Sequence, residues 1–568
     1  MHVAKIERRH GDRVYTSRLV RRSVREGKRV RHETIANVSR LPEEAIEALA
    51  RALRGEGLVA FSDRFRICDP LPHGHVEAVV AAARRLGLQR LLDRAPSKER
   101  DLALALICQR VLSPGSKLFT ARALSQSTLA AQLRVEGADQ DDLYRTMDWL
   151  LARQARIEDR LARRHLQAGT LVLYDVSSSY FEGRSCPLAR VGYSRDGRRG
   201  TPQIVYGLLC DARGCPVAVE VFEGSLHDDK TLPAQLEKLK RRFGLERVVV
   251  VSDRGMVTKA NLEAMRAEQD VGWITALKAP QVKKLVKEGA LQLSLFDEQN
   301  LAEIESEHYP GERLVVCRNP LVAEERARKR EALLAATERE LSQIERRVRE
   351  GTLCGEAEIG LAVGAVWNRY RVKKHFALEI TDTSFSFSPK SEQIEAEARL
   401  DGIYALRTST SAETLATTEV VRSYKQLKEV ERAFRSFKGP LEIRPVHHRL
   451  EERVRSHVFL CTLAYYLEWH LRQAWAELTF TDECPPSAPD PVAKASRSPA
   501  AEHKARAKRT NAGQAPHSFR SLIAELGRRT SNTIQVQDTK ASFAQLSEPT
   551  TLQARALELV HTKVPKIA

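Results

Sequence analysis

The spacing of apolar residues changes several times along the chain, and each change predicts a different kind of structure. Apolar and polar positions alternate over 13–24 and 29–36, which predicts two strands joined by a hairpin turn at 26–28. Pro42 opens a stretch with Ile46, Leu49, Leu53 and Val59 near one face, which predicts an amphipathic helix. From about 74 to 168, apolar residues recur every three or four positions, so we expect helices throughout this region.

Between residues 169 and 278 the pattern becomes one of short apolar runs, which predict strands. The runs cover 170–176, 203–210, 216–222, 247–252 and 272–277. One predicted helix precedes the fourth run, and another (259–269) follows it. Three strands in sequence followed by alternating strand and helix predict a ribonuclease-H-like sheet and an α/β fold class.

Residues 279–400 interrupt this order. Strand-like pieces at 313–317 and 369–372 surround a charged helix in which Leu334, Leu341, Ile344 and Val348 keep a spacing of three and four. We favour a short helical hairpin within an insertion over a long dimerising coil. The sheet is expected to resume at 402–406, followed by helices over about 411–438 and 450–477, a basic mobile linker over 485–515 and a small helical tail.

The charge balance points to a polyanionic partner. The 568 residues include 92 Lys and Arg against 74 Asp and Glu, a formal net charge of +18 with a pI near 9.6. Nucleic acid is the first candidate and an anionic membrane the second. No apolar run approaches the roughly 20 residues of a membrane span, and the charged N-terminus lacks a secretory segment, so we expect no membrane association. The nine scattered cysteines favour reduced thiols in the cytoplasm over zinc or disulfide bonding.

Two aspartates directly follow apolar runs. Asp175 comes after Leu171–Tyr174, and Asp253 comes after Val248–Ser252. Carboxylates at the ends of neighbouring parallel strands can reach one metal ion. A single such acid more often caps a turn, whereas the pair in this order of elements favours a metal-dependent phosphoryl-transfer site.

A third acid lies in a predicted helix over 424–438. At about 100° per residue, Leu427, Val430, Phe434, Phe437 and Leu441 form one apolar face of this helix. Glu431 lies at the edge of that face beside Tyr424, Lys428, Arg435 and Lys438, whereas Glu429 points to the opposite flank. Glu431 is therefore the better metal-ligand candidate. A surface helix with Glu–Lys pairs remains an equal alternative on spacing alone.

Two further segments are strongly basic. The glycine-rich stretch 192–200 carries Arg195, Arg198 and Arg199, which suits either a loop that follows a DNA backbone or a solvated hairpin. The segment 444–449, with Arg453, Arg455 and His457, adds positive charge after Glu431. For the adjacent His447 and His448, structural or phosphate-facing roles are favoured over metal binding.

These motifs resemble the DDE transposases of bacterial insertion sequences, in the group with a Tyr-Arg-Glu-Lys signature. Tyr424, Glu431 and Lys438 stand at the signature offsets, but Leu427 occupies the arginine position, with Lys428 beside it. The segments around Asp175 and Asp253 are similar to the first and second acidic motifs of the family. The resemblance implies a ribonuclease-H-like core with an insertion between the second Asp and the Glu. It also implies that Asp175, Asp253 and Glu431 bind two Mg2+ ions, for which Mn2+ substitutes.

The resemblance further implies a transposase that binds the terminal inverted repeats of a mobile element and catalyses strand cleavage and strand transfer. Double-stranded DNA would be the partner, bound by Tyr424, Lys428, Arg435, Lys438 and Arg254. A homodimer on paired ends and a bacterial, nucleoid-associated location in the cytoplasm are expected with it. An inactive DNA-binding regulator is the alternative. An aspartyl-phosphate phosphatase is disfavoured, because Ser177 stands where a second Asp is needed.

The predicted organisation has six parts: an N-terminal β-hairpin and helix (1–60), a helical DNA-binding region (61–168), the first part of the core (169–278), an inserted subdomain (279–400), the second part of the core (401–480), and a basic linker with a C-terminal tail (481–568).

Overall fold

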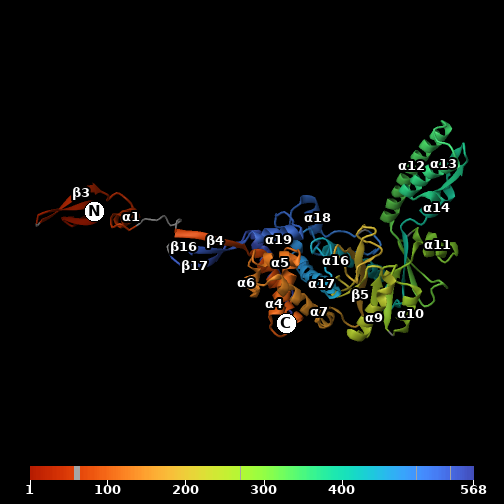
Figure 1. Cartoon of the computed structure of the whole chain (residues 1–568), viewed down its shortest axis with the longest axis horizontal. Helices are drawn as coiled ribbons and strands as arrows, with labels where there is room; N and C mark the ends of the chain where they lie inside the picture. Colours follow the sequence, from red (N-terminus) through yellow and green to blue (C-terminus); the bar gives the residue numbers. More distant parts are fainter. Residues whose placement is uncertain are drawn as a thin grey trace. The chain divides into compact units, whose positions relative to one another are not determined.

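The computed structural model describes the chain except Lys28, residues 57–63, Gln269, Glu298, Lys494, Asp538 and Ala568. The chain forms two compact units, the first from 1–71 with 530–548 and the second from 72–529 with 549–568 (Figure 1). Val59 of the predicted first helix, Lys28 of the predicted hairpin turn and Gln269 at the end of a predicted helix lie outside the described residues.

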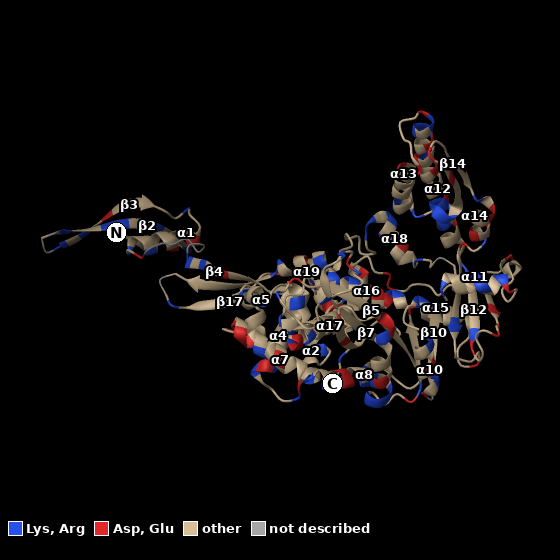
Figure 2. Cartoon of the chain, turned by 45° about the vertical axis from the view of Figure 1, so that its right-hand side comes forward, with Lys and Arg blue, Asp and Glu red and all other residues tan. Residues whose placement is uncertain are grey.

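The first unit contains two small antiparallel sheets. Strands β1 (His2–His10), β2 (Arg13–Glu26) and β3 (Arg29–Asn37) form one sheet, and helix α1 (Glu43–Leu53) follows them. The predicted hairpin is β2–β3, and β1 is an additional strand paired with β2. Basic positions occur along β2 and β3 (Figure 2).

The second small sheet corrects two predictions. Strand β4 (Phe65–Pro72) pairs with β16 (Thr530–Val536), which pairs with β17 (Ser542–Leu546). The region predicted as helical from 61 therefore begins with a strand, and the predicted helical tail supplies two more. Pairing between segments so distant in sequence leaves no local periodicity from which it could be read.

The second unit begins with a helical region whose elements are α2 (Gly74–Arg85), α3 (Leu88–Leu92), α4 (Lys98–Leu112), α5 (Lys117–Leu124), α6 (Leu129–Leu133), α7 (Gln140–Leu151) and α8 (Gln154–His165). Helix α4 and the later α17 (Glu451–Ala474) are buried over most of their lengths and pack together. The buried side chains of these helices form one continuous apolar cluster with the central sheet. The predicted boundary at residue 168 therefore does not separate compact units.

The central sheet has nine strands, namely β5 (Thr170–Tyr180), β6 (Arg190–Val191), β7 (Pro202–Asp211), β8 (Pro216–Glu223), β9 (Val248–Ser252), β10 (Val271–Ala276), β11 (Leu301–Ile304), β12 (Arg313–Arg318) and β15 (Ile403–Thr408). Strands β5, β7 and β8 are antiparallel neighbours, whereas β9 runs parallel to β5 and β10 runs parallel to β9. Helices α9 (Leu232–Glu237) and α10 (Lys259–Ala267) lie before and after β9 in sequence. The order is consistent with the predicted ribonuclease-H-like core.

The region 279–400 divides into two parts that the sequence did not distinguish. After α11 (Ala279–Lys287), strands β11 and β12 extend the central sheet through β15. Helices α12 (Pro320–Arg349) and α13 (Glu356–Tyr370) form the expected helical hairpin, with β13 (Phe376–Ile380), β14 (Phe385–Pro389) and α14 (Ser391–Ala398) beside it (Figure 1). The hairpin and the two strands have an apolar core of their own, to which Leu341, Ile344 and Val348 contribute. The predicted strand at 369–372 is wrong, because it overlaps the end of α13.

The remaining helices are α15 (Thr417–Lys425), α16 (Leu427–Lys438), α17, α18 (Pro499–Ala507), α19 (Phe519–Gly527) and α20 (Thr551–Lys563). The predicted linker over 485–515 therefore contains a helix, α18. Within the described part of the chain, no helix combines the length and the apolar character that crossing a membrane requires.

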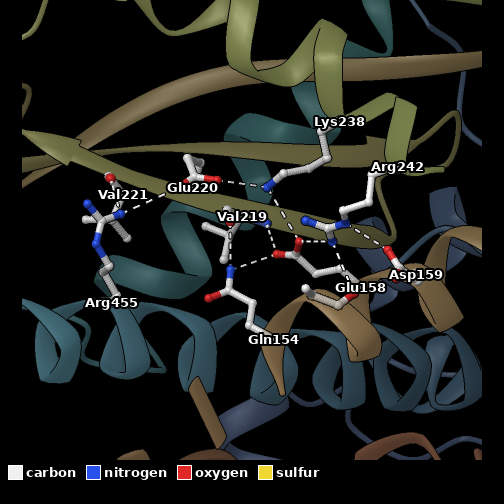
Figure 3. Close-up of polar contacts among 10 residues, drawn as sticks. Gln154, Glu158, Asp159, Val219, Glu220, Val221, Lys238, Arg242 and Arg455 are labelled. Carbon is white, nitrogen blue, oxygen red and sulfur yellow. Dashed lines mark hydrogen bonds and ion pairs between the residues drawn. The ribbon is translucent and has the colours of Figure 1, made fainter. Parts of the chain in front are cut away.

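The buried Glu158 of α8 forms polar contacts with the sheet and with the short helical segment η3 (Lys238–Arg242) (Figure 3). The carboxylate of Glu158 is fully shielded from solvent and accepts hydrogen bonds from Gln154 Nε2 (2.8 Å) and the Val219 amide (3.1 Å). Lys238 Nζ lies 3.4 Å from the same carboxylate, and Arg242 forms an ion pair with it. Opposite charge and hydrogen bonds together offset the cost of burying this carboxylate.

Candidate active site

The register of the central sheet brings Asp175 and Asp253 to the same level. Tyr174 of β5 is paired with Ser252 of the parallel strand β9, so the next residue of each chain segment is an aspartate. Strand β9 ends at Ser252, as predicted. Asp175 is not at a strand end, because β5 continues to Tyr180 along its antiparallel neighbour β7. The carboxylates nevertheless emerge side by side, since parallel neighbours in register keep their residues aligned.

A cavity of about 420 Å³ collects the three predicted acids, Asp175, Asp253 and Glu431. Its lining residues are Asp175, Val176, Ser177, Arg195, Asp228, Asp253, Met256, Glu431, Phe434, Arg435 and Lys438. Three carboxylates remote in sequence therefore face one space, with three cations around it.

The surroundings of Asp175 favour its protonated form. Burial raises the pKa of Asp175 to about 7, and the charges of Asp253 and Glu431 add to this rise. The Val176 amide donates a hydrogen bond to Asp175 Oδ1 (2.8 Å) and, with Arg195, acts in the opposite direction. Repulsion between the carboxylates persists, and a cation placed among them would relieve it.

Helix α16 presents Glu431 to the cavity. Its buried face includes Leu427, Val430, Phe434 and Phe437, and Glu431 is exposed at the edge of that face. The predicted continuous helix over 424–438 is wrong, because the chain changes from α15 to α16 at Gln426 and Tyr424 belongs to α15. The Tyr424 hydroxyl still donates a long hydrogen bond to Asp253 Oδ1 (3.5 Å). Burial, followed by the charge of Asp253, raises the pKa of Tyr424.

Three of the predicted DNA-binding cations line the cavity. Arg195 forms an ion pair with Asp228, and Arg435 is exposed on α16. Lys438 Nζ lies 2.9 Å from Asp196 Oδ1, and burial lowers the pKa of this lysine.

The other predicted cations lie outside this lining. Arg198 packs over the Tyr180 ring (3.8 Å) and forms an ion pair with Glu182, while Arg199 is exposed. Lys428 is exposed on α16.

Arg254 is also exposed, and it lines a different cavity. The three arginines of the basic loop over 192–200 therefore differ in position. Arg195 lines the cavity, whereas Arg198 and Arg199 do not.

Two acids of the site were not predicted. Asp228 lines the cavity, and Asp196 is buried where it forms ion pairs with both Lys438 and Arg444. Neither follows an apolar run, and Asp196 lies within a segment dominated by arginines. The one sequence feature that could have indicated Asp196 is an acid among several arginines. The local sequence does not distinguish such an acid from one in an exposed ion pair.

The donor set of the cavity fits hard divalent cations. Carboxylate oxygens are the ligands that Mg2+ and Mn2+ prefer. Among described residues, one group of three metal-ligating side chains has its donor atoms within 4.8 Å of one another, and it is His165, Cys215 and His470 rather than the acids. A wider spread of acids suits a pair of ions, which lie about 3.5–4 Å apart in two-metal sites.

The histidine and cysteine group has packing partners of its own. His165 Nε2 lies 3.2 Å from the Tyr466 hydroxyl, and Cys215 is a buried free thiol. Burial lowers the pKa of His470 to about 3 and raises that of Cys215.

Comparison with known proteins decides the family. The model of the family described as "Transposase DDE domain" matches residues 170–467, more than half of the chain and all three predicted acids. The chain belongs to the DDE transposases of insertion sequences. A second family model, "IS1634 family transposase, N-terminal domain", matches residues 3–60 of this transposase. No curated protein sequence matches it.

Two solved structures show distant similarity to this transposase. The cryo-EM structure of the piggyBac transposase synaptic complex with hairpin DNA is 11% identical, with 80% of this chain and 76% of that chain covered and a TM-score of 0.32. The Mos1 transposase paired-end complex with left transposon end is 16% identical, with 34% and 62% covered and a TM-score of 0.15.

Proposed function

We propose that this transposase cuts DNA strands at the terminal inverted repeats of its element and joins the freed ends to a target, in a reaction that depends on divalent metal. The observation that carries the proposal is the single cavity that holds Asp175, Asp253 and Glu431. Mutual repulsion among these acids prepares the cavity for cations, and the arginines and lysine around it suit phosphate groups.

We assign the active site to a ribonuclease-H-like core formed by β8, β7, β5, β9 and β10, with α16 supplying the glutamate. The support is the strand order, in which β5 lies between its antiparallel partner β7 and its parallel partner β9. The segment from α12 to α14 is the insertion between the second aspartate and the glutamate, and its separate apolar core supports this role.

Asp175, Asp253 and Glu431 would hold two Mg2+ ions, for which Mn2+ would substitute. Bound metal would activate the attacking oxygen, water in cleavage and a 3′-hydroxyl in strand transfer, and stabilise the leaving 3′ oxygen.

The chain's own residues position the reacting groups. Arg435 and Lys438 hold the phosphates on either side of the cut, and Arg195 reaches the same space from the loop over 192–200. Tyr424 steadies Asp253 through its hydroxyl. More distant parts of the DNA backbone are bound by exposed cations that do not line the cavity, namely Lys428, Arg254, Arg198 and Arg199.

The partner of this proposal is double-stranded DNA, both as element ends and as target. A net charge of +18 supports strong attraction to it, and affinity should fall steeply with salt as phosphates are neutralised. We propose a homodimer on paired ends, since both ends of an element must be cut together, and action at the nucleoid in the bacterial cytoplasm.

The test replaces Asp253 by Asn and follows nicking of labelled DNA with Mg2+. We expect cleavage to fall by at least about a thousandfold, because loss of one metal ligand removes transition-state stabilisation of several kcal/mol. DNA binding should change little. Glu429→Gln is the matched control, because Glu429 lies on the same helix, forms an ion pair with Arg432 and does not line the cavity.

The same assay separates the alternative function. A catalytically inactive DNA-binding regulator would bind DNA without nicking it in the wild type, under Mg2+ and under Mn2+. Equal cleavage by wild type and Asp253→Asn would refute the assignment of the acids.

A further inference from the structure

A second cavity, of about 710 Å³, lies in the second unit and is lined by several cations. Five basic side chains line it: Arg110, Lys117, Arg444, Arg449 and Arg453. The one acid in the lining, Glu442, is exposed. We call this space the basic cavity.

Two of the cations are buried without any compensating charge. Arg110 is 4% exposed and Lys117 is 3% exposed. Among the residues that the structure describes, no acid forms an ion pair with either side chain. Burying an unpaired cation is costly, and folded proteins rarely keep one without a ligand to offset it.

The electrostatic effect of these cations reaches the neighbouring side chains. Burial lowers the pKa of Lys117 to about 7, and the charge of Arg110 adds to the shift. Burial lowers the pKa of His448 to about 3 and also lowers that of His457, with Lys117 and Arg110 as the next causes for both. Arg110 and Lys117 therefore give this part of the space a positive potential, and no acid of the described residues pairs with either of them.

The local backbone increases this potential. Lys117 is the first residue of α5, whose N-cap Ser116 also lines the cavity. The N-terminus of a helix carries a partial positive charge and free amide groups, both of which favour anions. Arg453, by contrast, lies over the Tyr144 ring (4.5 Å) and 3.5 Å from Asp148, so its charge is partly compensated.

One buried acid connects the basic cavity to the active site. Asp196 forms ion pairs with Lys438, which lines the active-site cavity, and with Arg444, which lines the basic cavity. A DNA strand held by Lys438 therefore has the basic cavity within its immediate reach.

We propose that the basic cavity binds backbone phosphates of the DNA strand that enters the active site, with Arg110 and Lys117 as the phosphate ligands. The inference rests on the proposed function for the identity of the strand, but the affinity of the cavity for phosphate does not depend on catalysis. A free nucleotide or inorganic phosphate offers the same chemistry, and the experiment distinguishes these sources.

The experiment compares Lys117→Met with Lys259→Met in the full chain, each in an Asp253→Asn background so that DNA is bound but not cut. Lys259 is highly exposed, so the two substitutions remove the same side chain from different environments. Binding of a fluorescein-labelled duplex of arbitrary sequence is measured over a range of salt concentrations, and thermal unfolding is measured without DNA. Added inorganic phosphate and added dTMP form two further arms.

We expect Lys117→Met to weaken DNA binding by about tenfold and to lower the salt slope by about one, because one phosphate contact is lost. The same variant should unfold at a higher temperature than its parent without ligand, because an unpaired buried charge is gone. Lys259→Met should leave the unfolding temperature unchanged and affect binding less. A purely structural lysine would give the opposite change in unfolding temperature.

Equal DNA binding by the two variants would overturn the proposal, whether or not the wild type cleaves DNA. If phosphate or dTMP stabilises the parent but not Lys117→Met while DNA binding is equal, the cavity binds a small anion and the assignment to DNA is wrong. If Lys117→Met does not fold, Arg449→Gln, which alters an exposed lining residue, provides the same binding test. Failure of wild-type cleavage would count against the proposed function alone.

Discussion

Glu158 and Lys117 are both almost completely shielded from solvent, yet their surroundings differ. Glu158 accepts two hydrogen bonds and lies against Lys238 and Arg242 (Figure 3). Lys117 lies beside Arg110 and has no acidic partner among the described residues. The three acids of the active-site cavity resemble Lys117 in part, because each acid has other carboxylates near it and, among the described residues, none of the three forms an ion pair with the cations that line the cavity.

The difference indicates which buried charges serve the fold and which serve a ligand. A compensated charge joins elements, as Glu158 joins α8, β8 and η3. Its contribution to the stability of the fold is lost when one of its partners is removed. An uncompensated charge lowers stability until something of opposite sign binds. Substitutions should therefore have opposite effects on stability in the two kinds of region.

The largest effect is expected at the compensated site. Glu158→Ala removes the acid shared by Lys238 and Arg242, which keep only Glu220 and Asp159 as acidic partners among the described residues, and leaves the Val219 amide without an acceptor, so the free energy of unfolding should fall by about 3–5 kcal/mol. Urea denaturation followed by tryptophan fluorescence measures the change. A loss below about 1 kcal/mol would mean that Glu158 contributes no more than an exposed ion pair, and it would contradict the distinction between compensated and uncompensated buried charges.

Divalent metal should stabilise the acidic cavity by a smaller amount. Mg2+ in excess of its dissociation constant should raise the free energy of unfolding of the wild type by about 1–3 kcal/mol, and EDTA should reverse the rise. Asp253→Asn should respond less, and without metal it should be at least as stable as the wild type because one repelling charge is gone. A variant less stable than the wild type without metal would show that the acids are already compensated.

Two arginines sharpen the comparison for DNA binding. Arg435 is exposed at the active-site cavity, whereas Arg455 forms ion pairs with Glu451 (2.7 Å) and Glu220 (3.4 Å). Arg435→Gln should lower the salt slope of DNA binding by about one, and Arg455→Gln should leave it unchanged. Fluorescence anisotropy over a salt series tests both, and equal slopes for the two variants would contradict the distinction.

The smallest effect is expected for a pair that is compensated but exposed. Arg241 belongs to the same segment as Lys238 and Arg242, and its ion pair with Glu237 (3.4 Å) lies in solvent. Arg241→Gln should change the free energy of unfolding by less than about 0.5 kcal/mol. A larger loss in urea denaturation would mean that the ion pair between Arg241 and Glu237 stabilises the fold even though both side chains are exposed.

The sequence predicted the acids because each has a local signature. Asp175 and Asp253 follow apolar runs that became adjacent parallel strands, and Glu431 lies beside an apolar helical face that became buried. The residues that surround them depend on distant contacts. Asp196 enters the site from a loop and Asp228 from the three-residue helix η2 (Asp228–Lys230), and segments of this kind carry no periodic pattern.

The same distinction applies to the fold. The alternating elements between β5 and β10 were predicted, because each has its own periodicity. The return of the chain to the sheet at β15 was also predicted, but the addition of β11 and β12 beyond it and the burial of Lys117 were not, because segments far along the chain create both. Basic character was visible around 444–457, as predicted, but Arg455 proved to be held by acids.

The sheet of β4, β16 and β17 has a consequence for how the protein is made. Ribosomes add about 5–20 residues per second, so roughly 20–90 s separate the synthesis of Pro72 from that of Thr530. During this interval β4 has left the ribosome while its partner strand does not yet exist, and its open edge can pair with other nascent chains. We therefore expect messages truncated before the codon for Thr530 to yield aggregation-prone products, even though they encode every residue assigned to catalysis.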